Sequence, residues 1–475
     1  MKEIRTRFAP SPTGFMHIGN LRTALFEYFV AKKENGKFIL RVEDTDQERK
    51  VDGAIDFIYD TLKLCNIEID EGPGNPGSYG PYLQSERLDL YKEYALKLVD
   101  LGKAYYCFCS EDRLDGLRDQ AEKEKRAFMY DRHCCKLSKE EIDKKLENKE
   151  PYVIRQLMNN EGTSAYEDLV YGTISVDNSV LEDQILLKSD GYPTYNFANV
   201  IDDHLMDITH IIRGNEYIMS TAKYNQLYEA FGWDKPIYIH VPMVLGEDGQ
   251  KLSKRNGDAS FMDLYNEGYL PESIVNYLIL LGWSPNDNQE IFSISELEKV
   301  FDPRRIGKSS SQYDIKKLQW FNSIYIKKLD ISKLMEITIP HLENAYDISK
   351  KDKVWLEHLI RIYQGHISYG KEIVKVTDLF FKDDITLDEE CNSFMNEDGV
   401  SDTINAFKNE IENISSWNVD NINSAINNVK EKIGVKGKML YMPIRIKISG
   451  QMHGPELPDT IYLLGKDIVL NRLNK

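Results

Sequence analysis

The sequence lacks any apolar run long enough to cross a membrane. A membrane-spanning helix needs about 20 consecutive apolar residues, and no stretch of this chain reaches that length. The first residues also lack the apolar core of a secretory signal peptide and the arginine- and serine-rich composition of a transit peptide. We therefore expect a soluble, cytoplasmic protein with no membrane partner. We also expect it to act as a monomer.

Cysteine and positive charge are both scarce. Six cysteines occur among 475 residues, and the clustering of four of them between positions 107 and 135 suits a reducing compartment and a metal site better than disulfides. With 77 acidic and 60 basic side chains, the net charge is -17. That balance argues weakly against a nucleic acid partner, because binding phosphates needs basic surface, although a local basic patch can outweigh a total. The chain also lacks internal repeats and low-complexity segments.

The strongest pattern lies in the first fifty residues. An apolar strand is predicted over 4–8, a helix beginning near His17, and a second strand over 37–42. The helix is predicted because apolar residues recur on one face at three- and four-residue spacing (Ile18, Leu21, Leu25 and Phe29). Strand, helix and strand form a βαβ unit, which implies a parallel sheet. Ligands bind such sheets outside the carboxyl ends of the strands, where the loop before His17 falls.

The residues of this loop suit a phosphate ligand. Pro10 and Pro12 stiffen the backbone, while Gly14 and Gly19 let a ligand approach it closely. The start of the following helix offers backbone N–H groups and a positive dipole, and His17 can donate to a phosphate that gains charge. A tight turn with a capping histidine is the alternative interpretation.

These residues resemble a known family. The stretch from Ala9 to Asn20 resembles the HIGH signature of class I aminoacyl-tRNA synthetases, although Asn20 stands where the class often has a second histidine. Arg7-Phe-Ala-Pro-Ser-Pro-Thr-Gly together with Arg41-Val-Glu-Asp-Thr-Asp resembles glutamyl-tRNA synthetases. The resemblance implies that His17, Gly19 and Asn20 contact ATP. It also implies that the amino acid is held by three residues, Arg7, Ser11 and Glu43.

Two further segments carry charge into the same crevice. A helix is predicted from Thr194 and a strand over 208–212, which ends in Arg213; a helix-capping ion pair is the alternative role for this arginine. By resemblance, the glutamate-binding positions of this block are Tyr195, Asn199 and Arg213. After a strand over 237–245, Lys251-Leu-Ser253-Lys254-Arg resembles the KMSKS loop, although the bland alternative is a solvated basic turn. Lys251, Ser253 and Lys254 would then bind ATP, the two lysines neutralising its triphosphate.

The cysteine cluster resembles a zinc site. Thiolates and imidazole in two close pairs are typical zinc ligands, and some bacterial glutamyl-tRNA synthetases carry a C-x-C…C-x-H site here. Cys107, Cys109 and Cys134 match three of its ligands, but Lys136 stands where the histidine would be. Cys135 or His133 would have to supply the fourth ligand. A cluster of buried structural cysteines is the alternative.

The resemblance covers nearly the whole chain and implies an α/β fold with five segments. A Rossmann-like, parallel-sheet catalytic domain (1–103 and 189–245) is interrupted by an α/β insertion that binds the tRNA acceptor end (104–188). A KMSKS-type loop and stem-contact region (246–325) precedes an all-helical anticodon-binding region (326–475). In that last region we predict helices at 354–372, 403–414 and 421–433, and again after Pro458.

The implied activity is ATP-dependent attachment of L-glutamate to tRNA(Glu) through a glutamyl-adenylate, with Mg²⁺ accompanying ATP and with catalysis by His17, Lys251 and Lys254. We expect Arg7 to face the side-chain carboxylate of glutamate, and Arg213 the α-carboxylate or both. Two alternatives are a glutaminyl-tRNA synthetase and a non-catalytic RNA-binding relative. Tyr363-Gln-Gly-His366 lies where some members carry an arginine linked to rejection of the glutamine anticodon, so tRNA(Gln) is a second candidate partner.

Overall fold

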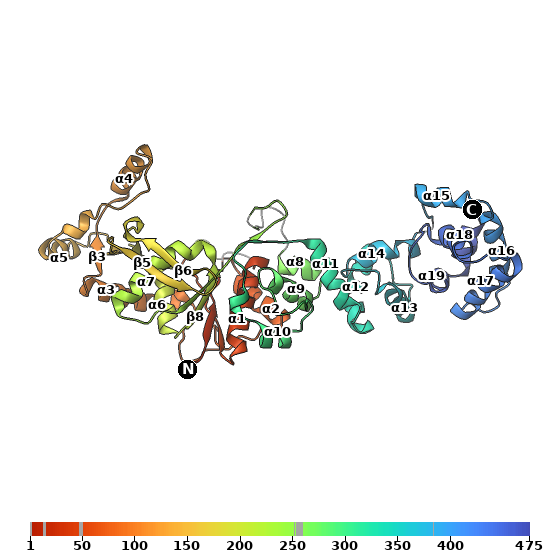
Figure 1. Ribbon diagram of the computed structural model, residues 1–475, viewed down its shortest axis with the longest axis horizontal. Coiled ribbons are helices and arrows are strands. Elements are labelled where there is room, and N and C mark those ends of the chain that lie inside the picture. Colours follow the sequence, from red (N-terminus) through yellow and green to blue (C-terminus); the bar gives the residue numbers. More distant parts are fainter. Residues whose placement is uncertain (1, 13–15, 47–50, 251, 253–259, 383) are drawn as a thin grey trace. The chain divides into compact units, whose positions relative to one another are not determined.

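A computed structural model describes residues 2–12, 16–46, 51–250, 252, 260–382 and 384–475 (Figure 1). The chain divides into two compact units. Unit 1 consists of Met1–Met262 and Ile274–Asp314, and unit 2 of Asp263–Ser273 and Ile315–Lys475. None of the helices in the described ranges combines the length and the apolar character needed to span a bilayer.

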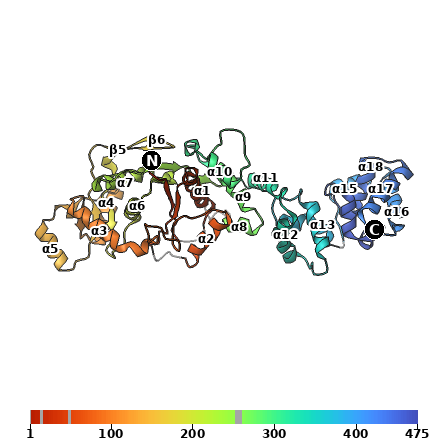
Figure 2. The ribbon, with the colours of Figure 1, turned by 90° about the horizontal axis from the view of Figure 1, so that it is seen from below.

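The predicted βαβ unit opens unit 1. Strand β1 (Arg5–Phe8) pairs in parallel with β2 (Lys37–Leu40), and helix α1 (Ile18–Lys33) connects them. His17 caps α1, because its side chain accepts a hydrogen bond from the backbone N–H of Gly19. Figure 2 shows α1 beside these strands. Its apolar residues are buried on most of its circumference, so α1 is a central helix of the unit.

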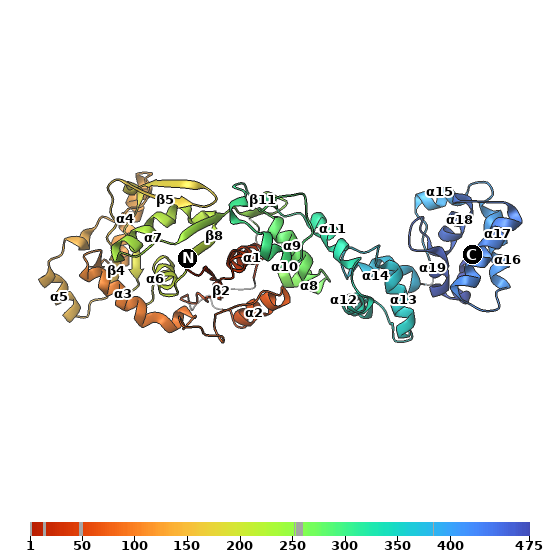
Figure 3. The same cartoon turned by 60° about the horizontal axis from the view of Figure 1, so that its bottom comes forward.

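The main sheet continues beyond β1. Thr209 donates its backbone N–H to the carbonyl of Arg5 (3.0 Å), which links β1 to a four-stranded sheet of order β6-β5-β9-β8. Its strands are β5 (Thr163–Asp168), β6 (Gly172–Asp177), β8 (His210–Gly214) and β9 (Ile237–Val241). Strand β9 runs parallel to both β8 and β5. The hairpin β5–β6 belongs to segment 104–188, yet it is an edge of this sheet (Figure 3).

A smaller antiparallel sheet has the order β3-β4-β7. Its strands are β3 (Ala104–Cys107), β4 (Val153–Gln156) and β7 (Ile185–Leu187). Helices α4 (Glu111–Lys123) and α5 (Lys139–Glu147) lie beyond β3 at one end of unit 1 (Figure 1). They bury almost no side chains: Ala121 alone in α4 and none in α5. These two helices therefore present polar surface.

Other elements lie between residues 54 and 312. They are α2 (Ala54–Leu64), α3 (Leu88–Asp100), α6 (Tyr195–Leu205), α7 (Ile218–Phe231), β10 (Val244–Leu245), α8 (Phe261–Asn266), α9 (Pro271–Leu280), α10 (Ile294–Val300) and β11 (Ser311–Gln312). The strand predicted over 237–245 is broken into β9 and β10. Pro242 stands between them and lacks a backbone N–H for the ladder, and β10 pairs with β11 instead.

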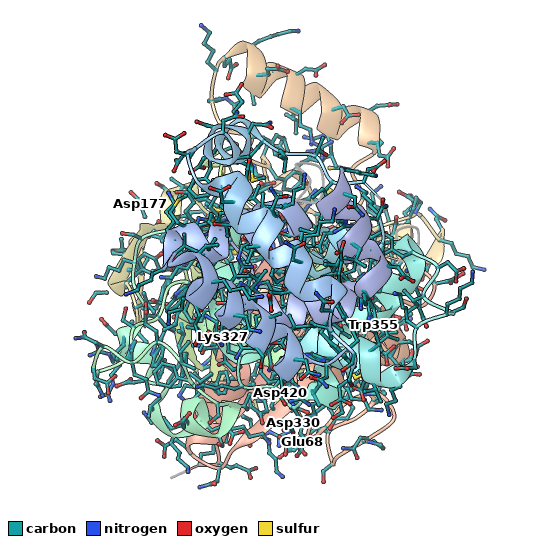
Figure 4. All side chains as sticks on the ribbon, turned by 90° about the vertical axis from the view of Figure 1, so that its right-hand side faces the viewer. Glu68, Asp177, Lys327, Asp330, Trp355 and Asp420 are labelled. Carbon is teal, nitrogen blue, oxygen red and sulfur yellow. The ribbon has the colours of Figure 1, made fainter. Side chains whose placement is uncertain are left out.

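As predicted, all regular elements among the described residues of unit 2 after 315 are helices. Its helices are α11 (Ile315–Ile326), α12 (Ile331–Ala345), α13 (Lys353–Tyr363), α14 (Glu372–Thr377), α15 (Glu389–Met395), α16 (Val400–Glu412), α17 (Val419–Ile433), α18 (Lys438–Ser449), α19 (Leu457–Leu464) and α20 (Lys466–Asn474). Trp355, labelled in Figure 4, ties α13 to α19 because its indole N–H donates to the carbonyl of Leu463 (2.9 Å).

One predicted helix of unit 2 was wrong. The helix expected over 354–372 ends at Tyr363 and is followed by a turn before α14. Gly370, near the end of the expected helix, approaches another backbone instead, since its N–H donates to the carbonyl of Gly268 (3.1 Å). A side chain there would meet the carbonyl oxygen of Ile337 at 2.2 Å. This close approach of backbones requires glycine, and an apolar periodicity carries no sign of it.

Candidate active site

A cavity of about 610 Å³ opens at the carboxyl ends of β1, β8 and β9. This is the position that the βαβ pattern predicts for a ligand. The cavity brings together eight of the predicted site residues from distant parts of the sequence: Arg7, Ser11, His17, Gly19, Asn20, Glu43, Tyr195 and Arg213.

His17 caps helix α1 at the wall of this cavity. Its Nδ1 accepts the backbone N–H of Gly19 (3.1 Å), as an N-cap side chain does. A neutral imidazole with an accepting Nδ1 carries its proton on Nε2. The cap fixes the tautomer that carries the proton on Nε2, and a contact of His17 with phosphate stays a prediction.

Arg7 is engaged by buried carboxylates. Its Nε lies 2.9 Å from Oδ1 of Asp203, and its Nη1 lies 3.5 Å from Oε1 of Glu27. Arg41, which is fully buried, pairs with the same Asp203 oxygen through Nη1 (2.7 Å) and with Glu43 through Nη2 (3.0 Å). Although burial opposes it, Arg7 and Arg41 hold the pKa of Asp203 below its ordinary value.

The ion pair with Arg41 therefore holds Glu43 at the cavity. Burial raises the pKa of Glu43 above its ordinary value, against the attraction of Arg41 and Arg7. An ammonium group arriving in the cavity would favour the charged form of this carboxyl. The pair of Arg41 and Glu43 thus suits an amino-acid ligand.

We predict that Arg41→Met will lower the free energy of unfolding by about 3–5 kcal/mol, because it leaves the buried charge of Glu43 without its partner and Asp203 with Arg7 alone. Arg304→Met is the matched control: Arg304 pairs with Asp302 (2.9 Å), and its side chain is 72% exposed. Its replacement should cost less than about 1 kcal/mol. Urea denaturation of both variants measures the difference, and equal losses would contradict the assigned role of the buried network.

Arg213 is placed differently from Arg7. It ends β8, and no described carboxylate forms an ion pair with it. Its Nη2 donates to the hydroxyl of Thr221 (2.6 Å) and its Nε to Nε2 of His240 (3.2 Å). Its Nη1 is buried and finds no hydrogen-bond partner in the part of the chain that the structure describes. Arg213 thus retains an uncompensated positive charge beside the cavity, which suits a carboxylate ligand. The capping ion pair considered for Arg213 is not formed with any described residue.

Tyr195 and Asn199 share helix α6 but not the cavity. Tyr195 lines it, and burial raises the pKa of its phenol well above the ordinary value, so the hydroxyl remains a hydrogen-bond donor. Asn199 is buried beneath, where its amide donates to the carbonyl of Tyr195 (2.8 Å). A direct contact of Asn199 with substrate stays a prediction.

The three predicted residues of the second signature, Lys251, Ser253 and Lys254, lie outside the described residues. Leu252 between them is described, buried and part of the cavity wall. Its backbone N–H donates to the carbonyl of Val244 (3.1 Å). The segment that carries this signature is therefore attached to the cavity at Leu252.

Several residues of the site were missed by sequence reasoning. Glu27 and Asp203 lie on helices that are recognised by the spacing of their apolar residues, which does not indicate a role for these carboxylates. Only the fold brings them to Arg7. His240 and Asp168 support Arg213 from the strand ends of β9 and β5. The signal for His240 was available, because a histidine within an apolar strand needs a buried partner.

The cysteine cluster forms a compact group near β3. The thiols of Cys107, Cys109 and Cys134 offer sulfur atoms within 4.8 Å of one another, and among the described residues neither His133 nor Cys135 belongs to this group. Cys135 is exposed. The Tyr130 hydroxyl lies 3.3 Å from the sulfur of Cys107 and 3.2 Å from that of Cys109. Three converging thiols are a donor set that zinc accepts.

Comparison with known proteins places this geometry in a family. A model of class I tRNA synthetases (E and Q), catalytic domain, matches residues 3–320, and a model of an anticodon binding domain matches residues 333–475. Glutamate–tRNA ligases of Clostridium acetobutylicum and Clostridium botulinum are each 48% identical to the chain, over 99% of its length and 97% of theirs. The chain belongs to the class I glutamyl-tRNA synthetase family.

Solved glutamyl-tRNA synthetases have the same fold. The enzyme of Elizabethkingia anophelis is 33% identical, with a TM-score of 0.90, and the match covers 100% of this chain and 99% of that chain. The glutamate tRNA ligase of Elizabethkingia meningosepticum, in complex with its amino acid, is also 33% identical over the same shares, with a TM-score of 0.88. The predicted α/β catalytic part and helical anticodon-binding part are thereby confirmed.

Proposed function

We propose that this glutamyl-tRNA synthetase attaches L-glutamate to tRNA(Glu) through a glutamyl-adenylate formed from ATP. The observation that carries the proposal is the single cavity in which the capped start of α1 meets the uncompensated guanidinium of Arg213. The first feature suits phosphate and the second a carboxylate. Both ligands are needed in one place for adenylation, and no protein nucleophile is required.

Glutamate would lie between β1 and β8. Arg213 supplies the charge for a carboxylate, and Glu43 with Ser11 would hold the ammonium group. Tyr195 can donate its hydroxyl to the substrate. Arg7 as partner of the side-chain carboxylate stays a prediction, and its contacts with Asp203 and Glu27 favour Arg213 for that role.

ATP would lie at the start of α1, as its Mg²⁺ complex. His17 would donate from Nε2 to the α-phosphate, where charge grows as the carboxylate attacks. Gly19 and Asn20 line the same wall. Lys251, Ser253 and Lys254 would bind the phosphates, the two lysines neutralising the triphosphate. Electrostatic stabilisation and positioning of this kind account for most of the catalysis in such transfers.

The tRNA would contact both units. We propose that segment 104–188, with its exposed helices α4 and α5, receives the acceptor end, and that residues 326–475 read the anticodon. Lys436, Lys438, Arg445 and Lys447 supply basic groups for the RNA backbone in an otherwise acidic chain. The terminal ribose hydroxyl would take the glutamyl group. The enzyme would act as a monomer in the cytoplasm, where its six free cysteines stay reduced.

Aminoacylation of purified tRNA(Glu) and tRNA(Gln) with glutamate tests the function. We expect charging of tRNA(Glu), and the turn at Tyr363–His366, without an arginine, leads us to include tRNA(Gln) as a second acceptor. A parallel reaction with glutamine tests the alternative that the chain is a glutaminyl-tRNA synthetase. If neither tRNA is charged and no glutamate-dependent exchange of ATP with pyrophosphate occurs, the chain is a non-catalytic relative and the proposal fails.

We also propose that Cys107, Cys109 and Cys134 hold zinc, with the Tyr130 hydroxyl or a water in the fourth position. Purified enzyme should contain about one zinc per chain. Cys109→Ser will lose most of the metal because it removes a ligand, whereas Cys135→Ser will keep it because that thiol is exposed and outside the group. Elemental analysis measures both. A zinc content near zero in protein never exposed to a chelator would leave the cysteines structural.

A further inference from the structure

The support of Arg213 is a chain of three buried side chains. Arg213 donates from Nε to Nε2 of His240 (3.2 Å), and Nδ1 of His240 lies 2.7 Å from Oδ2 of Asp168. We propose that His240, oriented by Asp168, is a positioning residue that presents Arg213 to a carboxylate of the amino acid and so determines glutamate affinity. The inference rests on the proposed function.

Asp168 is a fixed anchor for this chain. It ends β5, and its Oδ1 accepts the backbone N–H groups of Val170 (3.0 Å) and Tyr171 (2.8 Å). Its Oδ2 accepts the backbone N–H of His240 (3.0 Å) in addition to the ring. Four hydrogen bonds leave the carboxylate no other arrangement, and His240 is fully buried. The carboxylate of Asp168 thereby orients the ring of His240.

The hydrogen-bond roles in the chain follow from chemistry. A guanidinium has only donors, so Nε2 of His240 must accept from Arg213. Nδ1 must then carry the ring proton and donate to Asp168, which is an acceptor. The imidazole is neutral in this state. Burial lowers the pKa of His240, which favours the neutral form.

A neutral spacer preserves the charge of Arg213 for the ligand. Asp203 pairs directly with Arg7 and compensates its charge, whereas Asp168 acts on Arg213 only through the ring of His240. The Nε edge of the guanidinium is used by His240, and Nη2 gives one hydrogen to Thr221. The donors that remain are those of Nη1, which has no hydrogen-bond partner among the described residues, and the second hydrogen of Nη2. These point to end-on binding of a carboxylate.

Two substitutions at His240 separate positioning from packing. The amide of glutamine reaches about as far from the backbone as Nε2 of histidine, and that of asparagine only as far as Nδ1. His240→Gln can therefore restore an acceptor for Arg213, whereas His240→Asn keeps a polar group near Asp168 but leaves Arg213 without one. Loss of a hydrogen bond to a charged group corresponds to a loss of affinity of about 10- to 100-fold.

The test is ATP–pyrophosphate exchange with glutamate in the presence of tRNA(Glu), using the full-length enzyme. His240→Asn should raise the KM for glutamate about 10- to 100-fold with the KM for ATP unchanged, and His240→Gln should return it to within about threefold of wild type. Equal effects of the two variants, or an equal rise in the KM for ATP, would overturn the proposal and leave the ring a packing group.

A second pair keeps the test decisive if the His240 variants unfold. Thr221 accepts from Nη2 of Arg213 (2.6 Å), so Thr221→Val should raise the KM for glutamate and Thr221→Ser should not. No difference between these two would also count against positioning of Arg213. If wild-type enzyme shows no glutamate-dependent exchange, the proposed function fails, and the same comparisons are then made on glutamate binding by calorimetry.

Discussion

Replacing His17 by asparagine will lower kcat for glutamate activation by about 10²–10³-fold and change the KM for ATP little. The reason is that Nε2–H faces charge that grows on the α-phosphate only in the transition state, so its loss affects kcat rather than ground-state binding. Steady-state exchange of ATP with pyrophosphate, with tRNA(Glu) present, measures both constants.

The choice of asparagine makes this experiment specific. His17 caps α1 through Nδ1, and asparagine is a good N-cap residue, so the variant should melt close to the wild-type temperature. His17→Gln is the complementary variant, since its longer amide can place a donor near the position of Nε2 but caps poorly. We expect it to lose stability and to retain more activity than His17→Asn. An asparagine variant with nearly wild-type kcat would remove His17 from the catalytic set.

Replacing Arg213 by glutamine will weaken glutamate binding by about 2–5 kcal/mol, which corresponds to roughly 30- to 5,000-fold. A carboxylate brought into the cavity would then lack the uncompensated charge that Arg213 provides. Glutamine, whose amide is neutral, should lose much less if Arg213 meets the side-chain carboxylate. Exchange assays with each amino acid give the ratio of the two kcat/KM values.

Arg7→Gln is the matched comparison for this prediction. Asp203 retains Arg41 as a partner at 2.7 Å when Arg7 is replaced, so that variant should fold, although with reduced stability. We expect it to lower glutamate use and to shift the ratio of glutamate to glutamine less than Arg213→Gln does. A larger shift for Arg7→Gln would assign the side-chain carboxylate to Arg7, which is the assignment we expect from the sequence. If a variant loses activity equally with glutamate and with glutamine, the arginine that it replaces contacts a group that both amino acids share.

Local patterns predicted the parts of the site that depend on local structure. The position of His17 at the start of α1 followed from apolar spacing, and Arg213 from its place after an apolar strand. The partner of Arg7 could not be predicted in this way, because Asp203 is 196 residues distant in the sequence and its side of α6 is set by packing. Tyr130 likewise approaches the cysteine thiols only through the fold of segment 104–188, and its ring carries no signal of that contact.

The hairpin β5–β6 limits how far the two parts of unit 1 can be exchanged or engineered separately. Strand β5 belongs by sequence to the segment proposed to receive the tRNA, yet it pairs with β9 and ends at Asp168 behind Arg213. A chimera that replaces 104–188 as one block would therefore also replace the anchor of the amino-acid site. Exchange points that keep β5 and β6 with the catalytic sheet should preserve glutamate affinity. The part of segment 104–188 that can be exchanged independently should therefore end inside the segment, before β5, rather than at residue 188.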